Sequence, residues 1–201
     1  MKLILVRHEE RGIDIGFFSE LTDKGIIQSL EIPERIKSIL KEKTSTNLEF
    51  ENKTDNNITI DEIFCSPFIR TLQTVYKCSK EFKKKVKLEY GLYEYLHNPY
   101  FLLFDSYYEK KDIKDIDLLK IIDNKYKSVV ERDDLKVLED ETNLEKRIIK
   151  FFDSIKEDYK NKTILIVTHE GVINKIKDIY VKKTDMSDKY PMGHIEVYDI
   201  L

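Results

Sequence analysis

The sequence predicts an α/β fold: a three-layer α/β/α sandwich with a mostly parallel central sheet and an inserted cap of helices and loops. Two uncharged aliphatic runs, residues 3–6 and 163–167, have the composition of buried strands. Helix signals alternate with the strand candidates, as is typical of parallel sheets. The 201 residues suit one domain with a sizeable core. We therefore expect residues 1–201 to form a single domain, with residues 91–135 as the cap.

The N-terminal part is predicted to contain a strand, a loop and an interrupted helix. After the first strand, residues 9–20 have the composition of a loop. Thr22 is a suitable N-cap for the helix that follows, and Pro33 indicates a break in it. Residues 42–57 are polar and are predicted to form a surface loop. Before this loop the helix is expected to resume through apolar residues at helical spacing, namely Ile36, Ile39 and Leu40.

A strand, a helix and a short strand are predicted next. Residues 58–64 are expected to be the second strand. Ser66 and Pro67 are the residue types that favour an N-cap and a first helical position. The helix should run to about Phe82, and residues 86–89 alternate as a third strand.

The second half of the chain begins with a stretch of unclear periodicity. Residues 91–135 are rich first in aromatic residues and then in Asp, Lys and Ile, and we interpret them as a cap over a functional site. Residues 142–145 match a capping box. After the strand at 163–167, a helix is expected over residues 171–181 and a last strand near 195–198. The helix that follows the capping box has apolar residues at helical spacing: Leu144, Ile148, Phe152, Ile155 and Tyr159.

Composition excludes several classes of function. The formal net charge is −3 and 36% of the residues are charged, which does not favour nucleic acid or an anionic membrane as the main partner. No apolar run approaches the roughly 20 residues of a membrane helix. Cys65 and Cys78 do not make a disulfide framework, and no signal peptide is recognisable. We expect a reducing, cytoplasmic setting.

Two Arg- and His-bearing segments directly follow the two aliphatic strands. Arg7 and His8 come after the first strand, and His169 and Glu170 come after the strand at 163–167. If the two strands are parallel neighbours, their carboxyl ends meet at one edge of the sheet. Two imidazoles and a guanidinium would then converge, which predicts an anion site that contains a nucleophile.

Four segments of the chain, in this order, resemble the histidine phosphatase superfamily, the phosphoglycerate mutase-like proteins. They are Val6-Arg7-His8, Leu21-Thr22-x-x-Gly25-x-x-Gln28, Ser66-Pro67-x-x-Arg70-Thr71-x-Gln73-Thr74, and Thr168-His169 with Gly171. Within the superfamily, three features look most like the tyrosine-phosphatase-like catalytic domains of the ubiquitin-associated SH3 phosphatases. These features are the Arg-His-x-x-Arg pattern that ends at Arg11, Cys-Ser-Pro before Arg70, and Gly-Leu-Tyr-Glu up to Glu94.

The resemblance implies a phosphomonoester hydrolase that acts through a phosphohistidine on His8. Arg7, Arg70 and His169 would hold the phosphoryl oxygens, and Arg11 would add a third arginine. Guanidinium groups match phosphate through charge-assisted bonds, so no metal or other cofactor is expected. The substrate would be a phosphorylated small molecule or a phosphoprotein, and the protein a monomer or a homodimer.

The proton donor has two candidates. The family commonly uses a glutamate after the third strand, here Glu94, whereas its acid-phosphatase branch uses an acid after the second histidine, here Glu170. We favour Glu94, because its position matches the commoner family pattern. A partly buried carboxyl group beside a phosphate dianion would have a raised pKa and could protonate the leaving group. The family usually has glycine after each catalytic histidine, and Glu9 and Glu170 depart from that pattern.

Other functions stay open at this point. A phosphoglycerate mutase or a fructose-2,6-bisphosphatase-like sugar phosphatase has the same fold. An inactive phosphate-binding or scaffold module is the alternative from another class, suggested by the two glutamates. A cysteine phosphatase needs Cys-x5-Arg, whereas Cys65 and Arg70 are spaced as Cys-x4-Arg.

Aromatic residues at the start of the cap suggest a preference for aryl phosphate or phosphotyrosine. They can equally pack a small core of the cap itself. These residues are Tyr93, Tyr95, Tyr100, Phe101 and Phe104.

Overall fold

The computed structural model describes residues 1–46, 59–99, 112–136, 138–181 and 190–200. Its centre is a five-stranded sheet with the strand order β3-β2-β4-β1-β5. Neighbouring strands are parallel except for β5, which runs antiparallel to β1. This confirms the predicted α/β class and the mostly parallel sheet. The strands are β1 (Lys2–Arg7), β2 (Glu62–Cys65), β3 (Val86–Leu88), β4 (Thr163–Thr168) and β5 (Ile195–Asp199).

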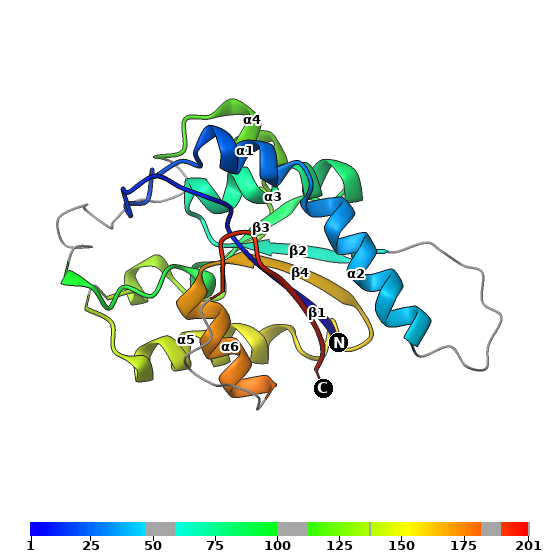
Figure 1. The fold of residues 1–201 in the computed structure, drawn as a ribbon. Coiled ribbons are helices and arrows are strands. Elements are labelled where there is room, and N and C mark those ends of the chain that lie inside the picture. The colour runs from blue at the N-terminus through cyan, green and yellow to red at the C-terminus, as the bar shows by residue number, and fades with distance from the viewer. Residues whose placement is uncertain (47–58, 100–111, 137, 182–189, 201) are drawn as a thin grey trace.

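Six α-helices cover the two faces of this sheet (Figure 1) among the residues that the structure describes. The helices α1 to α4 lie on one face, and α5 and α6 lie on the other. The molecule therefore has the expected three layers. The helices are α1 (Asp23–Ser29), α2 (Ile32–Thr46), α3 (Ile69–Phe82), α4 (Ile116–Ile121), α5 (Glu141–Ile155) and α6 (Glu170–Tyr180).

The two central strands are buried on both faces, which explains their uninterrupted aliphatic sequences. In β1, Ile4 and Val6 belong to the core beneath α2 and α3, whereas Leu3 and Leu5 belong to the core beneath α5 and α6. The alternation follows from the two-residue repeat of a strand. A continuous apolar run thus stabilises both layers at once.

Two predicted helix starts were wrong. Thr22 caps α1 as expected, and its hydroxyl accepts a hydrogen bond from Gly25 N. However, α3 begins after Phe68 rather than Ser66, because the Ser66 hydroxyl bonds to a histidine ring instead of capping the helix. The cap of α5 is Asp140, which accepts from Asn143 N, so the helix begins before the predicted box at residues 142–145. Asp is an equally good N-cap and offers the same oxygen earlier in the chain.

Pro33 lies in the first turn of α2, where its missing N–H costs nothing. The expected break before it is present, because α1 ends at Ser29 and α2 begins at Ile32. The helix α2 continues to Thr46, so the predicted surface loop at 42–57 was wrong at its start, and its remainder lies outside the described residues. The second strand is also shorter than the predicted 58–64.

The predicted cap segment contains little regular structure in the part that is described. It includes the 3-10 turn η1 (Tyr90–Leu92), the helix α4, and the 3-10 turn η4 (Arg132–Asp134). Tyr93 is fully buried and packs edge-on against Phe68, so its ring belongs to the core and not to an open pocket. Three aromatic residues expected to line a pocket, Tyr100, Phe101 and Phe104, lie outside the described residues.

None of the helices in the described part of the chain is long and apolar enough to cross a membrane.

Candidate active site

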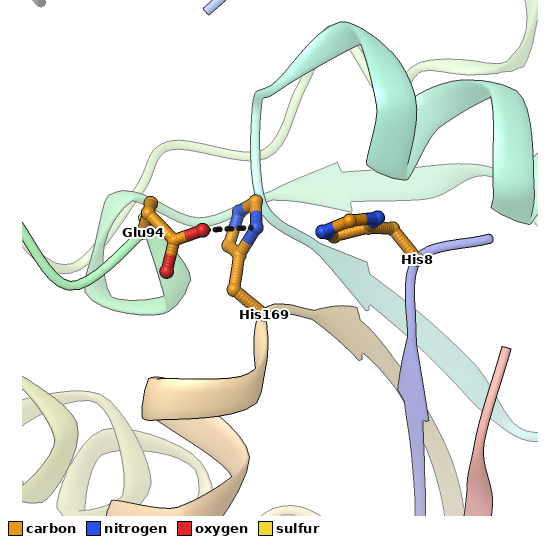
Figure 2. Close-up of side chains that lie close together, drawn as sticks. All are labelled: His8, Glu94 and His169. Carbon is orange, nitrogen blue, oxygen red and sulfur yellow. Dashed lines mark ion pairs between the residues drawn. The ribbon is translucent and has the colours of Figure 1, made fainter. Parts of the chain in front are cut away.

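The two predicted histidines meet at the carboxyl edge of the central strand pair. Arg7 and Thr168 are partners in the parallel register of β1 and β4, so the next residue of each strand is a histidine. The His8 N–H donates to Thr168 O over 3.0 Å. The ring centroids of His8 and His169 are 5.3 Å apart, and Figure 2 shows His169 between His8 and Glu94. The sequence prediction that both strands deliver their histidines to one place is therefore met by the geometry.

His8 is held in one tautomer. Its Nδ1 lies 2.9 Å from the carbonyl oxygen of Glu9, and a carbonyl can only accept, so Nδ1 carries the proton. Nε2 then holds the lone pair. Burial lowers the pKa of His8 well below its usual value, and Arg70 and His169 lower it further. The ring is therefore neutral at pH 7, as a nitrogen nucleophile must be.

His169 contacts both Ser66 and Glu94. Its Nε2 lies 2.9 Å from Ser66 Oγ, and its Nδ1 lies 3.1 Å from Glu94 Oε2, the ion pair drawn in Figure 2. Burial lowers the pKa of His169 to about 4, although Glu94 opposes the change. At neutral pH the ring has one proton, which belongs on Nδ1 beside the carboxylate, and the Ser66 hydroxyl donates to Nε2.

Arg70 is fully buried, and its NH2 lies 3.4 Å from His169 Nδ1. It donates from its terminal nitrogens to Gly16 O over 2.9 Å and to Glu94 Oε2 over 3.2 Å. Its guanidinium stacks over the Phe68 ring at 4.2 Å. Its buried Nε has no hydrogen-bond partner in the described part of the chain, which leaves one donor available. Burial lowers the pKa of Arg70 to about 10, so the charge persists at neutral pH.

Glu94 is an ionised carboxylate in this state. Burial raises its pKa, but His169, Arg70 and His8 together outweigh burial and hold the pKa of Glu94 well below its usual value. The side chain is 19% exposed. The raised pKa that we expected for Glu94 beside a bound phosphate thus does not apply to the free site. In the free site the positive charge of Arg70 directly faces the Glu94 carboxylate.

Arg7 and Glu170 engage each other. Arg7 NH1 lies 3.0 Å from Glu170 Oε2 and also donates to the carbonyl of Tyr190. Glu170 additionally accepts from Tyr190 N over 3.2 Å. The Glu170 carboxylate therefore neutralises a predicted phosphate-binding arginine in this state, and an incoming phosphate would compete with it.

Glu9 does not add a negative charge to the site. Its carboxylate is buried and pairs with Arg35 of α2 at 3.1 Å. Arg35 also donates to Gly193 O over 2.6 Å, and Gly193 N donates to His8 O over 3.0 Å. Gly193 has φ +72°, and a Cβ there would lie 2.2 Å from the Glu9 carboxylate oxygens. Glu9 therefore joins β1, α2 and the turn before β5, and its replacement of the usual glycine has a structural explanation.

Arg11 is partly exposed and is bound by its own loop. Its NH1 donates to Gly12 O over 2.7 Å and to Asp14 O over 2.9 Å. Burial lowers the pKa of Arg11, Glu94 raises it, and Arg7 lowers it. The third predicted arginine is therefore within electrostatic reach of Glu94, while its side chain donates to its own loop.

Two residues of the site, Ser66 and Arg147, were not found from the sequence. Ser66 was interpreted as a helix cap, although its place at the end of β2 could have suggested a role at the sheet edge. Arg147, on the opposite layer, donates to the backbone carbonyl of Glu94, and nothing in its local sequence indicates this.

His8, Glu94 and His169 are also a set that could ligate a metal, because their ligand atoms lie within 4.8 Å of one another. Two neutral imidazoles and a carboxylate are suitable ligand types for zinc. However, the buried guanidinium of Arg70 lies 3.2 Å from the carboxylate and 3.4 Å from His169 Nδ1, and its charge opposes a cation. The charges favour an anion at this position.

A protein-family comparison matches residues 52–184 to the histidine phosphatase superfamily (branch 1). The matched region contains Arg70, Glu94 and His169, whereas His8 lies before it and is placed by the fold. No curated protein matches the sequence.

Several solved structures share the fold. The ecdysone phosphate phosphatase from Bombix mori, in complex with tungstate, has a TM-score of 0.64 and 16% identity, and the alignment covers 100% of this chain and 91% of that one. A mycobacterial glucosyl-3-phosphoglycerate phosphatase has a TM-score of 0.64 and 13% identity, with 98% and 88% covered. The phosphoserine phosphatase of Entamoeba histolytica, in complex with 3-phosphoglyceric acid, has a TM-score of 0.57 and 23% identity, with 98% and 89% covered. At these identities the likeness concerns the fold alone.

Proposed function

The chain belongs to the histidine phosphatase superfamily and is a phosphatase of that type, and we propose that it hydrolyses phosphate monoesters through a phosphohistidine on His8. The observation that carries the proposal is the pairing of a neutral, tautomer-fixed imidazole with a buried guanidinium and a carboxylate. His8 offers Nε2 as the nucleophile, since Nδ1 is bound to Glu9 O. Arg70 and His169 both act electrostatically on His8, and they would stabilise the charge that develops on the phosphoryl oxygens.

The proposed reaction has two steps. In the first, His8 Nε2 forms a bond to phosphorus while the ester P–O bond breaks, and Glu94 gives its proton to the leaving oxygen. In the second, water attacks the phosphohistidine, Glu94 takes the proton from that water, and the N–P bond breaks to release phosphate. His8 returns to its neutral form, and no metal or redox partner enters either step.

Glu94 is proposed as the acid over Glu170 for two reasons. The branch 1 match favours the family pattern in which the acid follows the third strand. Glu94 also contacts His169 and Arg70, whereas Glu170 is engaged by Arg7. A bound phosphate would take up the donors of Arg70 and His169 and add negative charge beside Glu94. Both effects raise the pKa of a carboxyl group, so substrate binding itself would supply the protonated acid.

A preference for aryl phosphates or phosphotyrosine is part of the proposal. Its support is the aromatic composition at the start of the predicted cap. Within that stretch Tyr95 packs against the start of α6, where a Cβ on Gly171 would lie 3.1 Å from Tyr95 Cβ. The motif likeness to the ubiquitin-associated SH3 phosphatases supports the same preference through Arg11. Neighbours of the fold include phosphatases of phosphorylated small molecules, which leaves a small substrate or a phosphoprotein as the expected partner.

We also propose a cytoplasmic setting and a single domain with residues 91–135 as a cap. The setting is supported by two free, buried cysteines, Cys65 and Cys78, which suit a reducing compartment. The domain proposal is supported by the described part of residues 91–135, in which α4 packs on α3, η1 packs on α5, and most of the buried side chains join the core beneath α2 and α3.

The proposed function is tested by hydrolysis of para-nitrophenyl phosphate in the presence of EDTA. We expect wild-type turnover and its loss, by at least about 1,000-fold, in His8→Ala. Lys150→Ala, an exposed change on α5, is the matched control and should retain full activity. Unchanged turnover in folded His8→Ala protein would exclude the phosphohistidine mechanism. No wild-type turnover on this or on phosphotyrosine and sugar phosphates would favour the inactive phosphate-binding alternative.

A further inference from the structure

The proposed acid, Glu94, lies in a segment without regular secondary structure. It follows η1, and residues 93–97 have neither helical nor strand structure. A carboxylate that must transfer a proton needs a fixed position, and a misplacement of about 1 Å can cost 100-fold in rate. The position of Glu94 therefore has to be set by contacts from other elements.

Those contacts converge on the backbone carbonyls around Glu94. Arg147 of α5 donates from NH1 to Gly91 O over 2.6 Å and from NH2 to Glu94 O over 3.1 Å. Thr168, at the end of β4, donates from its hydroxyl to Leu92 O over 2.7 Å. Glu139 N donates to Leu96 O over 3.1 Å. Four carbonyls between residues 91 and 96 thus accept from donors outside the segment.

The orientation of the Arg147 guanidinium is fixed by a second buried residue, Glu139. Its Nε and NH2 donate to the two carboxylate oxygens of Glu139 over 2.7 and 2.9 Å. Arg147 is 6% exposed and Glu139 is 5% exposed, so neither charge is solvated. The carboxylate balances the guanidinium and fixes the plane in which its remaining N–H groups reach the carbonyls. A lysine has the charge but lacks this planar fork.

The backbone before Glu139 is strained, as is common where a fixed arrangement is needed. Leu138 has φ 62°, a left-handed conformation that leucine rarely adopts, and its side chain is 54% exposed. Because the Leu138 side chain is exposed, burial of its apolar surface does not offset the backbone strain. The conformation coincides with the turn that brings Glu139 inward to Arg147 and Leu96.

We infer that Arg147 and Glu139 are positioning residues for proton transfer by Glu94, linking α5 to the acid across the layer opposite Arg70. The inference rests on the proposed function, since it assumes that Glu94 protonates the leaving group. The pair touches no reacting atom. It acts by holding the carbonyls of Gly91 and Glu94, so that the Glu94 carboxylate faces the bond that breaks.

The experiment compares kcat/KM for two aryl phosphates whose leaving groups differ in their need for a proton. Dinitrophenolate leaves without protonation, whereas the phenolate of phenyl phosphate needs an acid. Arg147→Lys keeps the charge beside Glu139 but loses the fork. We expect it to lower kcat/KM for phenyl phosphate about 10- to 100-fold and for 2,4-dinitrophenyl phosphate by less than about threefold. Glu94→Gln should show the same selectivity, and adding Arg147→Lys to it should cause no further selective loss.

Two further variants complete the test. Lys150→Ala removes an exposed charge of the same helix, paired with Asp134 at 3.1 Å, and should leave both substrates unaffected. If Arg147→Lys does not fold, Glu139→Gln replaces it, because the amide keeps the size of the carboxylate and weakens the fork. Equal losses for both substrates, or no loss, would overturn the positioning role. Wild-type inactivity on both would overturn the proposed function instead, and lack of selectivity in Glu94→Gln would remove Glu94 as the acid.

Discussion

Burial controls the protonation states of the residues at the site. His8 and His169 are neutral because a charged imidazole is costly away from water, and Arg70 adds to that cost. Glu94 is ionised because the attraction of His169 and Arg70 exceeds its own cost of burial. The free site therefore combines a neutral nucleophile, a charged guanidinium and a carboxylate. A bound phosphate would accept hydrogen bonds from Arg70 and His169 in place of Glu94.

The pKa of His169 predicts how stability depends on pH. Its pKa is about 4 in the folded protein and about 6.5 in an unfolded chain. The unfolded state then binds more protons between these values, so stability is present above pH 6.5 and is lost as the pH falls to 4. Urea unfolding should show that the wild type loses about 2 kcal/mol more than His169→Asn between pH 7 and pH 4.5. Parallel pH dependences of the two proteins would contradict this assignment.

Sequence patterns located the reacting residues better than they located the partners of those residues. The strand exits and motifs indicated His8, His169, Arg70 and Glu94, which the fold brings together. The roles of Glu9 and Glu170 could not be predicted, because each depends on an arginine that is distant in the sequence. Glu9 pairs with Arg35 of α2, and Glu170 pairs with Arg7 at the end of β1. A charge that appears harmful in a motif can be neutralised by a tertiary contact that the motif does not contain.

At the scale of elements, the first helix is fitted to the loop that follows His8. A Cβ on Gly25 would lie 2.1 Å from the backbone oxygen of Glu10. Thr22 N donates to the same oxygen over 2.9 Å. The helix α1 therefore packs directly on the segment that carries the nucleophile, which gives a physical reason for glycine in the motif Leu21-Thr22-x-x-Gly25.

This contact predicts a pair of substitutions with different outcomes. Gly25→Ala should destabilise the protein by about 2 kcal/mol or more, because a backbone atom would have to move. Gly12→Ala is the matched control, since a Cβ there meets nothing within 4 Å. Chemical denaturation of both variants measures the difference. Equal stabilities would show that the loop after His8 adapts freely and is not fixed by α1.

Helix and strand existence was predictable, but several boundaries were not. The aliphatic runs of β1 and β4 and the Thr22 cap depend on local chemistry and were confirmed. The start of α3 depends on Ser66 bonding to His169, a contact 103 residues away in the sequence. Local pattern could not reveal that the hydroxyl was already engaged, nor that Asp140 would cap α5 ahead of Thr142.

At the scale of the whole molecule, residues of the site come from both helix layers and from the sheet between them. Figure 1 shows these layers. The sheet supplies His8 and His169, α3 supplies Arg70 from one face, and α5 supplies Arg147 from the other. The three-layer architecture could be predicted from the alternation of elements. The dependence of the segment that carries Glu94 on α5 could not be predicted, because it arises only when the second layer packs on the sheet.

The phosphohistidine mechanism is tested most directly by trapping the covalent intermediate. A rapid acid-free quench of wild-type enzyme with 2,4-dinitrophenyl phosphate, whose leaving group needs no acid, followed by peptide mass spectrometry, should find phosphate on His8 that is stable in base and labile in acid. We expect this adduct in wild type, its accumulation when Glu94→Gln slows the second step, and its absence in His8→Ala. Phosphate on another residue would contradict a phosphohistidine on His8. A single turnover that releases the leaving group without forming any adduct on His8 would contradict it as well.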